Sequence, residues 1–183
     1  VLDIDVIVEE DYVTKNFIEL WFYPNSTQVQ DYAFEKITFN EFTDEVTNIF
    51  AVTKNADGTL TRFENEDIKQ IDSNTYNVFT DSKQKVINYP NVDVGSITGI
   101  TYSIKTDKRK LESDWSYIVY LRGYSDLRQF RFSLENRQQE ILNIQSNADF
   151  LACEEKEKTL LCKANDVKKV QSDEVWYFRD ETP

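Results

Sequence analysis

The chain has 183 residues, enough for one domain or two small ones, and it contains no histidine and no methionine. Without histidine, Ser-His-Asp catalysis, Cys-His catalysis and imidazole metal sites are excluded within this chain. The net charge of −12 repels nucleic-acid phosphates and anionic lipids, so we expect no nucleic-acid partner. No apolar run approaches the length of a membrane span and no signal peptide remains, so we expect no direct membrane insertion. Because Val1 is not a natural start, we expect a piece processed or excised from a longer protein.

The first 42 residues predict strands separated by polar turns. Leu2–Val8 is apolar with acidic interruptions, and Val13–Tyr23 is a dense aromatic run that is buried on both faces or on one. Asn25-Ser26-Thr27 fits either a glycosylation site or a simple turn, and we favour the turn. The next segment, residues 31–42, indicates a strand but also permits a helical start.

A hairpin is the clearest signal in the middle of the chain. Val46–Thr53 and Thr59–Phe63 flank Asn55-Ala56-Asp57-Gly58, so we expect Gly58 in the left-handed position of the turn. After it we expect one or two helical turns over 64–71 and a short strand over 75–80.

Residues 86–105 predict a strand, a turn and a second strand. Pro90 ends the first strand because it has no N–H to donate. Gly95 adopts a positive φ without steric cost, which the end of such a turn often requires. Beyond Gly95, apolar residues alternate with polar ones, as in a strand with one buried face.

The C-terminal part continues this pattern. Residues 116–121 and 130–134 alternate between apolar and polar side chains, and residues 138–145 and 175–178 supply further strands. Residues 165–173 are polar, with apolar residues spaced for one helical turn. Short strands with hairpin signals and no sustained helical period predict an all-β, mainly antiparallel fold, either a β-sandwich with few short helices or an open barrel. We favour the sandwich, as one domain over residues 1–183.

Charged clusters offer few candidates for chemistry. Lys105–Lys110 holds the only basic cluster, and a solvated loop is favoured there over a binding patch. Acidic clusters lie at Glu9–Asp11, Glu64–Asp67 and Glu154–Glu157. A glycosidase carboxylate pair or a weak Ca²⁺ site is conceivable among them, but solvated acids are the favoured interpretation. We therefore assign no catalytic residue, no cofactor and no metal ligand. Exposed tryptophans are typical of surfaces that bind carbohydrate or protein, but most tryptophans in a β-sandwich lie in or near the core. We therefore assign no ligand contact to Trp21, Trp115 or Trp176.

Cys153 and Cys162 flank a polar stretch that fits a hairpin. Opposed positions on two such strands lie close enough for a disulfide. Free thiols and a metal pair are the alternatives, and two thiolates alone do not complete a zinc shell. We favour the disulfide, which indicates an oxidising compartment.

Several turn motifs resemble the bacterial domain of unknown function DUF3857, which commonly precedes a transglutaminase-like domain in exported proteins. The segments that carry the resemblance are Asp57-Gly58, Tyr89-Pro90, Gly95-Ser96-Ile97 with Tyr102, and the aromatic strands from Trp115 to Leu134. The match covers most of residues 1–150. The cysteine hairpin is a departure from the family pattern.

The resemblance implies a β-sandwich, a periplasmic or otherwise extracytoplasmic location, and an accessory role beside a papain-like Cys-His-Asp module. The implied partner is a downstream catalytic domain of the same chain or a protein or peptide ligand, and the domain itself carries no catalytic residues. The alternative is a free-standing β-sandwich that binds carbohydrate or protein. An enzyme that uses carboxylates alone is a third and weaker hypothesis.

The cysteine pairing is testable by intact mass. If Cys153 and Cys162 are joined, we expect the mass of the native chain to lie below that of the reduced chain by two hydrogen atoms. Equal masses, with both thiols open to alkylation, would contradict the pairing.

Overall fold

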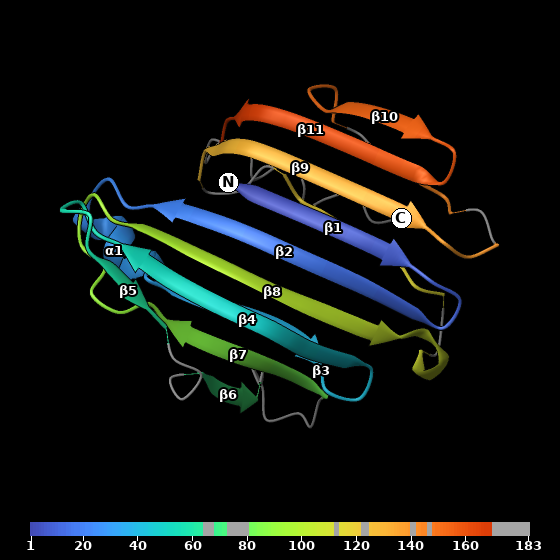
Figure 1. Cartoon of the computed structure of the whole chain (residues 1–183), viewed down its shortest axis with the longest axis horizontal. Helices are drawn as coiled ribbons and strands as arrows, with labels where there is room; N and C mark the ends of the chain where they lie inside the picture. Colours follow the sequence, from blue (N-terminus) through green and yellow to red (C-terminus); the bar gives the residue numbers. More distant parts are fainter. Residues whose placement is uncertain are drawn as a thin grey trace, which may run out of the picture.

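Two β-sheets, one large and one small, make up the described part of the protein (Figure 1). The structure is a computed structural model that describes residues 1–63, 68–72, 81–111, 114–121, 125–139, 142–145 and 148–169. Within these residues the large sheet has eight strands in the order β10-β11-β9-β1-β2-β8-β4-β5. Their bounds are Ala152–Lys156 (β10), Thr159–Val167 (β11), Leu127–Asn136 (β9), Leu2–Val8 (β1), Tyr12–Phe22 (β2), Ile97–Asp107 (β8), Asp44–Lys54 (β4) and Leu60–Arg62 (β5).

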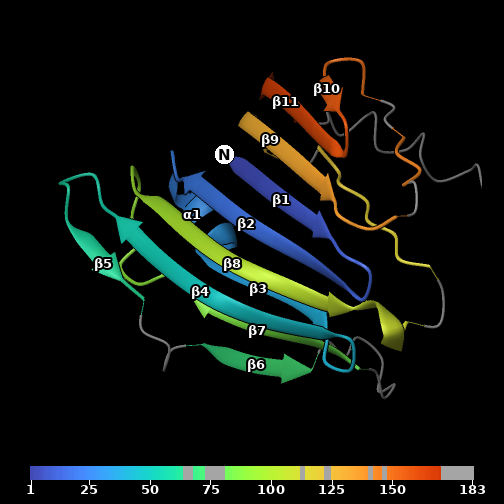
Figure 2. The same cartoon turned by 45° about the vertical axis from the view of Figure 1, so that its right-hand side comes forward.

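The small sheet has the order β3-β7-β6, with β3 at Phe34–Asn40, β7 at Ser82–Asn88 and β6 at Lys69–Asp72. Figure 2 shows β3 and β7 in a second layer that runs alongside β4 and β8. Two short helical pieces complete the described part of the chain, α1 (Ser26–Tyr32) and the 3₁₀ turn η2 (Lys108–Lys110). The expected all-β fold with few short helices is confirmed.

Strand pairing is antiparallel with one exception among the described strands. β1 lies between β2 and β9, antiparallel to β2 and parallel to β9, so that Ile4 is opposite both Phe17 and Phe132. The N-terminal strand thereby joins the first hairpin to the C-terminal strands, and the large sheet is mixed.

The core lies between the layers and draws on both sheets. Val6, Phe17 and Ile100 of the large sheet belong to one buried cluster with Ile37 and Ile87 of the small sheet. Each such side chain stabilises the fold by roughly 1.5–3 kcal/mol through its burial. Irregular segments add partly buried side chains to the same cluster, among them Trp115, Tyr117, Val119, Leu121, Leu142, Phe150 and Leu151.

The turn between β7 and β8 carries the chain from the small sheet to the large one. Gly95 has φ +88°, as expected, and its N–H donates to the Tyr23 carbonyl over 2.7 Å. A Cβ at this position would lie 3.2 Å from the Cβ of Ala56, so the turn also packs closely on the β4–β5 hairpin. The hydroxyl of Ser96 accepts from the N–H of Asp93 and donates to Asn55.

Several local predictions hold in the structure. The β4–β5 hairpin turns at Gly58, whose φ is +88°. The simple turn favoured at Asn25-Ser26-Thr27 was wrong, because Asn25 caps α1 by accepting from the N–H of Gln28 at 2.9 Å. The segment 31–42 combines both of its alternatives, because the end of α1 is followed by β3.

Other local predictions were wrong. Residues 69–72 form strand β6 and not a helical turn, because they pair with β7. Residues 165–167 continue β11, and Val167 is buried. Residues 116–121 alternate in exposure as expected but form no strand, and residues 138–139 and 142–145 form none either. The strands expected at 75–80 and 175–178, and the acids of 64–67, lie outside the described residues.

The two-layer core predicts unequal effects of two isoleucine truncations in the small sheet. Ile87 on β7 is fully buried, so Ile87→Ala should lower the free energy of unfolding by about 2–5 kcal/mol. Ile71 on β6 is 45% exposed, and Ile71→Ala should change it by no more than about 0.5 kcal/mol. Urea unfolding measures both, and equal effects would show that the small sheet does not contribute to the core.

Candidate functional site

The acidic clusters lie on the surface. Glu9 and Asp11, in the β1–β2 turn, approach Arg137 and Arg109 at 3.6 and 3.8 Å respectively. Glu154, Glu155 and Glu157 are exposed around the β10–β11 turn. Among the residues that the structure describes, no group of three or more Asp, Glu, Cys or His side chains is arranged to hold a metal ion. The acidic clusters therefore offer no defined ligand site in this part of the chain.

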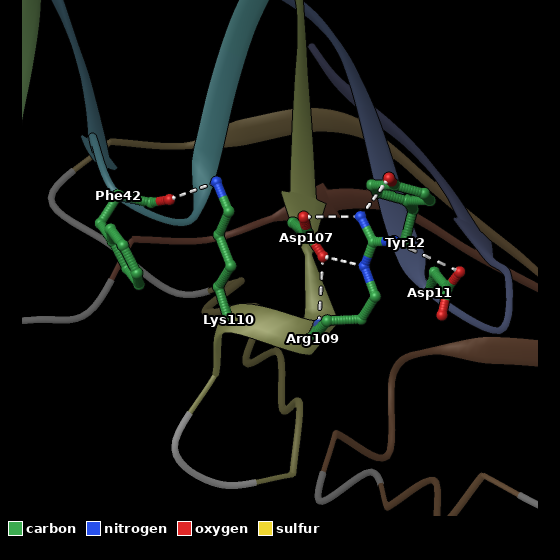
Figure 3. Close-up of polar contacts among 6 residues, drawn as sticks. All are labelled: Asp11, Tyr12, Phe42, Asp107, Arg109 and Lys110. Carbon is green, nitrogen blue, oxygen red and sulfur yellow. Dashed lines mark hydrogen bonds and ion pairs between the residues drawn. The ribbon is translucent and has the colours of Figure 1, made fainter.

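The basic cluster is occupied by contacts within the protein (Figure 3). Arg109 of η2 donates twice to Asp107, at 2.9 Å each, and also to the hydroxyl of Tyr12. These contacts raise the pKa of Arg109 and lower that of Asp107. Lys105 lies over the Tyr12 ring, with Nζ 4.0 Å from its centroid. Through these contacts with Tyr12, the cluster links the end of β8 to the start of β2.

Lys110 extends the same fastening to the β3–β4 turn. Its Nζ donates to the Phe42 carbonyl at 3.0 Å and lies 5.3 Å from the centre of the Phe42 ring (Figure 3). Beside it is an open hollow of about 350 Å³ lined by Asn40, Phe42, Thr43, Asp81, Lys110 and Leu111. Because the cationic groups already have partners, the cluster resembles a structural clip more than an anion-binding patch.

A polar cluster, which the sequence analysis did not predict, lies between the two sheets. Glu19 is on the core-facing side of β2, in the row that contains Phe17 and Tyr23, and its carboxylate accepts from the Tyr102 hydroxyl at 2.9 Å. Burial raises the pKa of Glu19, and the Tyr102 hydrogen bond offsets part of that shift. Burial and the charge of Glu19 raise the pKa of Tyr102 as well.

Glu35 enters this interlayer cluster from the small sheet. It shares the inner face of β3 with Ile37 and lies opposite the fully buried Ile87. Burial first, and the charge of Glu19 second, raise the pKa of Glu35 to about 7. Two carboxyl groups from opposite sheets thus share one partly dehydrated space.

Tyrosines and a threonine surround these carboxyl groups. The Tyr23 hydroxyl donates to the Tyr32 carbonyl at 2.8 Å and lies 3.0 Å from the hydroxyl of Thr98. The Tyr89 hydroxyl is buried beside Thr98 and has no hydrogen bond of good geometry among the described residues. Burial raises the pKa of Tyr117 to about 12, aided by Glu19.

The opposite face of the large sheet is apolar over part of its area. Ile18, Leu20 and Phe22 of β2, Phe50 of β4 and Ile97 of β8 are between 40% and 57% exposed, and we call them the outer stripe. In the ladders Phe22 is opposite Ile97, and Leu20 is opposite Gly99. A Cβ on Gly99 would lie 2.9 Å from Leu20 and 3.5 Å from Val52. Because glycine has no side chain, Leu20 of β2 and Val52 of β4 can pack against the backbone of β8 at this point.

Charged residues border the outer stripe. On the adjoining strands, Arg131 of β9 donates to Asp3 and Asp5 of β1 at 2.8 and 3.1 Å. Arg62 of β5 lies over the Phe50 ring, with Cζ 6.0 Å from its centroid. An apolar patch with a polar border is typical of a surface that binds another protein.

The described tryptophans do not form a sugar platform. Trp21 is partly buried on the inner face of β2 and stacks with Tyr32 at 6.2 Å between centroids. Trp115 is partly buried against the core and stacks with Tyr117. Trp176 lies outside the described residues.

Comparisons with known proteins agree with this architecture. The family model of DUF3857, a domain of unknown function with solved structures, matches residues 24–171. No curated protein matches the sequence. The fold is similar to the crystal structure of a protein from Parabacteroides distasonis ATCC 8503 named a "putative protease", with a TM-score of 0.70 and 13% identity. The similarity covers 93% of this chain but 35% of the other, so the chain spans about one third of that protein's length.

The interlayer cluster predicts unequal effects of removing two tyrosine hydroxyls. Tyr102→Phe keeps the ring stacked on Phe17 but removes the donor to Glu19, so at about pH 6 it should lower the free energy of unfolding by about 1–3 kcal/mol. Tyr89→Phe removes a buried hydroxyl that lacks a partner and should be neutral or stabilising. Urea unfolding of both variants is the measurement, and a larger loss for Tyr89→Phe would contradict this account.

Proposed function

The chain belongs to the DUF3857 family. We propose that it is a non-catalytic accessory domain of an exported protein, packed against a transglutaminase-like catalytic domain of the same polypeptide. The outer stripe is the observation that carries the proposal. It exposes apolar side chains on the large sheet of a chain that is otherwise rich in charge.

The cysteine and histidine content supports a non-catalytic role. Papain-like and transglutaminase-like chemistry needs a thiolate activated by histidine. In this chain Cys153 and Cys162 are joined to each other, and the sequence has no histidine. The catalytic groups of such a protein would therefore come from another domain.

The disulfide also supports an extracytoplasmic location. Cys153 on β10 lies directly opposite Cys162 on β11, and their sulfur atoms are bonded. Such bonds persist in oxidising compartments and are rare in the cytosol. Among the described residues, no helix has the length and apolar character needed to cross a membrane.

A neighbouring domain suits the outer stripe better than a sugar does. Three of its five side chains are aliphatic, whereas carbohydrate platforms use flat aromatic faces, and the two described tryptophans are turned inward. The similar solved protein is much longer than the region that matches this chain, so a domain of this kind occurs there within a longer polypeptide. The free-standing carbohydrate-binding or protein-binding sandwich is the second hypothesis.

The test compares the isolated chain with the complete natural polypeptide. We expect the isolated chain to show no peptide hydrolysis or transamidation, and the complete polypeptide to show one of them. Phe22→Ser with Phe50→Ser should leave the thermal midpoint of the isolated chain nearly unchanged, because both rings are exposed, but should lower that of the complete polypeptide.

Tyr120→Ser is the matched control, because Tyr120 is 82% exposed and lies outside the outer stripe. It should leave both midpoints unchanged. Turnover by the isolated chain would refute the non-catalytic role. Equal midpoints for the double variant and the native complete polypeptide would refute docking through the outer stripe.

A further inference from the structure

The small sheet meets the large sheet at two carboxyl groups that come from opposite layers. Glu19 projects inward from β2, and Glu35 projects inward from β3. In both strands the neighbouring inward positions are apolar, with Phe17 on β2 and Ile37 on β3. The carboxyl groups thus occupy places in the core that apolar side chains would otherwise fill.

No lysine or arginine among the described residues forms an ion pair with either carboxyl group. Glu19 accepts from Tyr102, and Glu35 accepts from the N–H of Lys36 at 3.0 Å. The Val1 ammonium attracts Glu19 but donates its hydrogen bond to the Leu20 carbonyl. The Trp21 side chain also donates to Glu19. The other groups around the pair are the hydroxyls of Tyr23, Tyr89, Tyr117 and Thr98.

The nearby lysines are engaged elsewhere. On β2, Lys15 lies 5.2 Å from the Tyr117 ring centre and is attracted by Asp44. On β7, Lys85 lies over the Phe39 ring, and Lys83 pairs with Glu41 and Asp72. On β3, Lys36 lies over the Phe34 ring.

We propose that a proton held by the Glu19–Glu35 pair keeps the small sheet closed against the large one. Two like charges in a poorly hydrated space repel each other strongly. When the sheets are closed, the favoured state therefore has one carboxyl group protonated and the other ionised. Glu19 already has the Tyr102 donor that stabilises its charge, so Glu35 is the carboxyl group that retains the proton. Loss of that proton loosens β3 and β7 from the core.

The direction of the pH dependence follows from linkage. The pKa of Glu35 is about 7 when the sheets are closed and returns towards its ordinary value of 4.5 when they part. The closed form therefore binds more protons than the open form between these values, and its advantage falls as the pH rises through this interval. The small sheet should be most firmly closed below about pH 4.5 and reach its loosest state above about pH 7.

Amide hydrogen exchange tests the proposal on the native protein. Protection of β3 and β7, corrected for the intrinsic exchange rate, should fall on the order of tenfold or more from about pH 5 to about pH 8. Protection of β1 and β9, which do not carry the pair, should change much less. A uniform change over all four strands would overturn the proposal, because it would show no local opening.

Three variants assign the effect to the pair. Glu35→Gln should abolish the fall, since its side chain cannot ionise, and Glu19→Gln should reduce it by removing the repulsion. Glu45→Gln, at an exposed position of β4, is the charge-matched control and should retain the full effect. The same fall in Glu35→Gln as in the native protein would overturn the proposal.

A measurement on the native chain covers the case in which Glu35→Gln does not fold. The carboxyl carbon of Glu35, followed by NMR, should titrate with a midpoint near 7. A midpoint near the ordinary glutamate value would overturn the proposal without any substitution.

Discussion

The turn from Tyr89 to Ser96 is the constraint on which the two-layer arrangement depends. It takes the chain out of one sheet and into the other, and the backbone groups at its two ends pair as continuations of the β3–β7 and β2–β8 ladders. The carbonyls of Tyr23 and Ala33 accept from the N–H groups of Gly95 and Tyr89. Both acceptors lie next to the ends of strands, β2 in one layer and β3 in the other. These bonds therefore anchor one end of the turn to the small sheet and the other end to the large sheet.

Strand β2, which faces the second layer, has an unusual distribution of polarity. A strand with one buried face usually directs its acids to solvent and its apolar residues inward. β2 places Glu19 inward and Ile18, Leu20 and Phe22 outward. The tyrosines around Glu19 supply a hydroxyl group that makes the inward acid tolerable. The outward residues are exposed. The docking that we propose and the interlayer carboxyl pair therefore involve opposite faces of the same strand.

Local signals in the sequence predicted the features that local residues decide. Gly58 and Gly95 mark turns because only a positive φ closes them, and the alternation at 130–134 marks one buried face. Patterns that fit both a helix and a strand led to wrong predictions. Ile68 and Ile71 are spaced as in a helix, but pairing with β7 makes residues 69–72 a strand. The parallel pairing of β1 with β9 joins residues more than a hundred positions apart, and nothing local encodes it.

The candidate sites were missed for a related reason. Residues 17–23 are so rich in aromatic side chains that Glu19 is easily taken for a surface interruption. Counting every second residue from Phe17 to Tyr23 places Glu19 in the buried row, and that count was the available signal. Its meeting with Glu35 depends on the packing of two sheets and has no counterpart in the sequence. By contrast, the sequence predicted that Cys153 and Cys162 lie opposite each other, because both belong to one hairpin.

The cysteine link has a consequence for how the large sheet ends. β10 is exposed at all five residues and buries no side chain of its own, so burial does little to hold it in place. Behind it lies β11, whose Leu160 and Ala164 are buried. If β10 separated, β11 would present a longer strand with unpaired backbone groups, a template on which further copies of the chain can add strands. The covalent bond therefore holds β10 against β11 and keeps this edge of β11 paired.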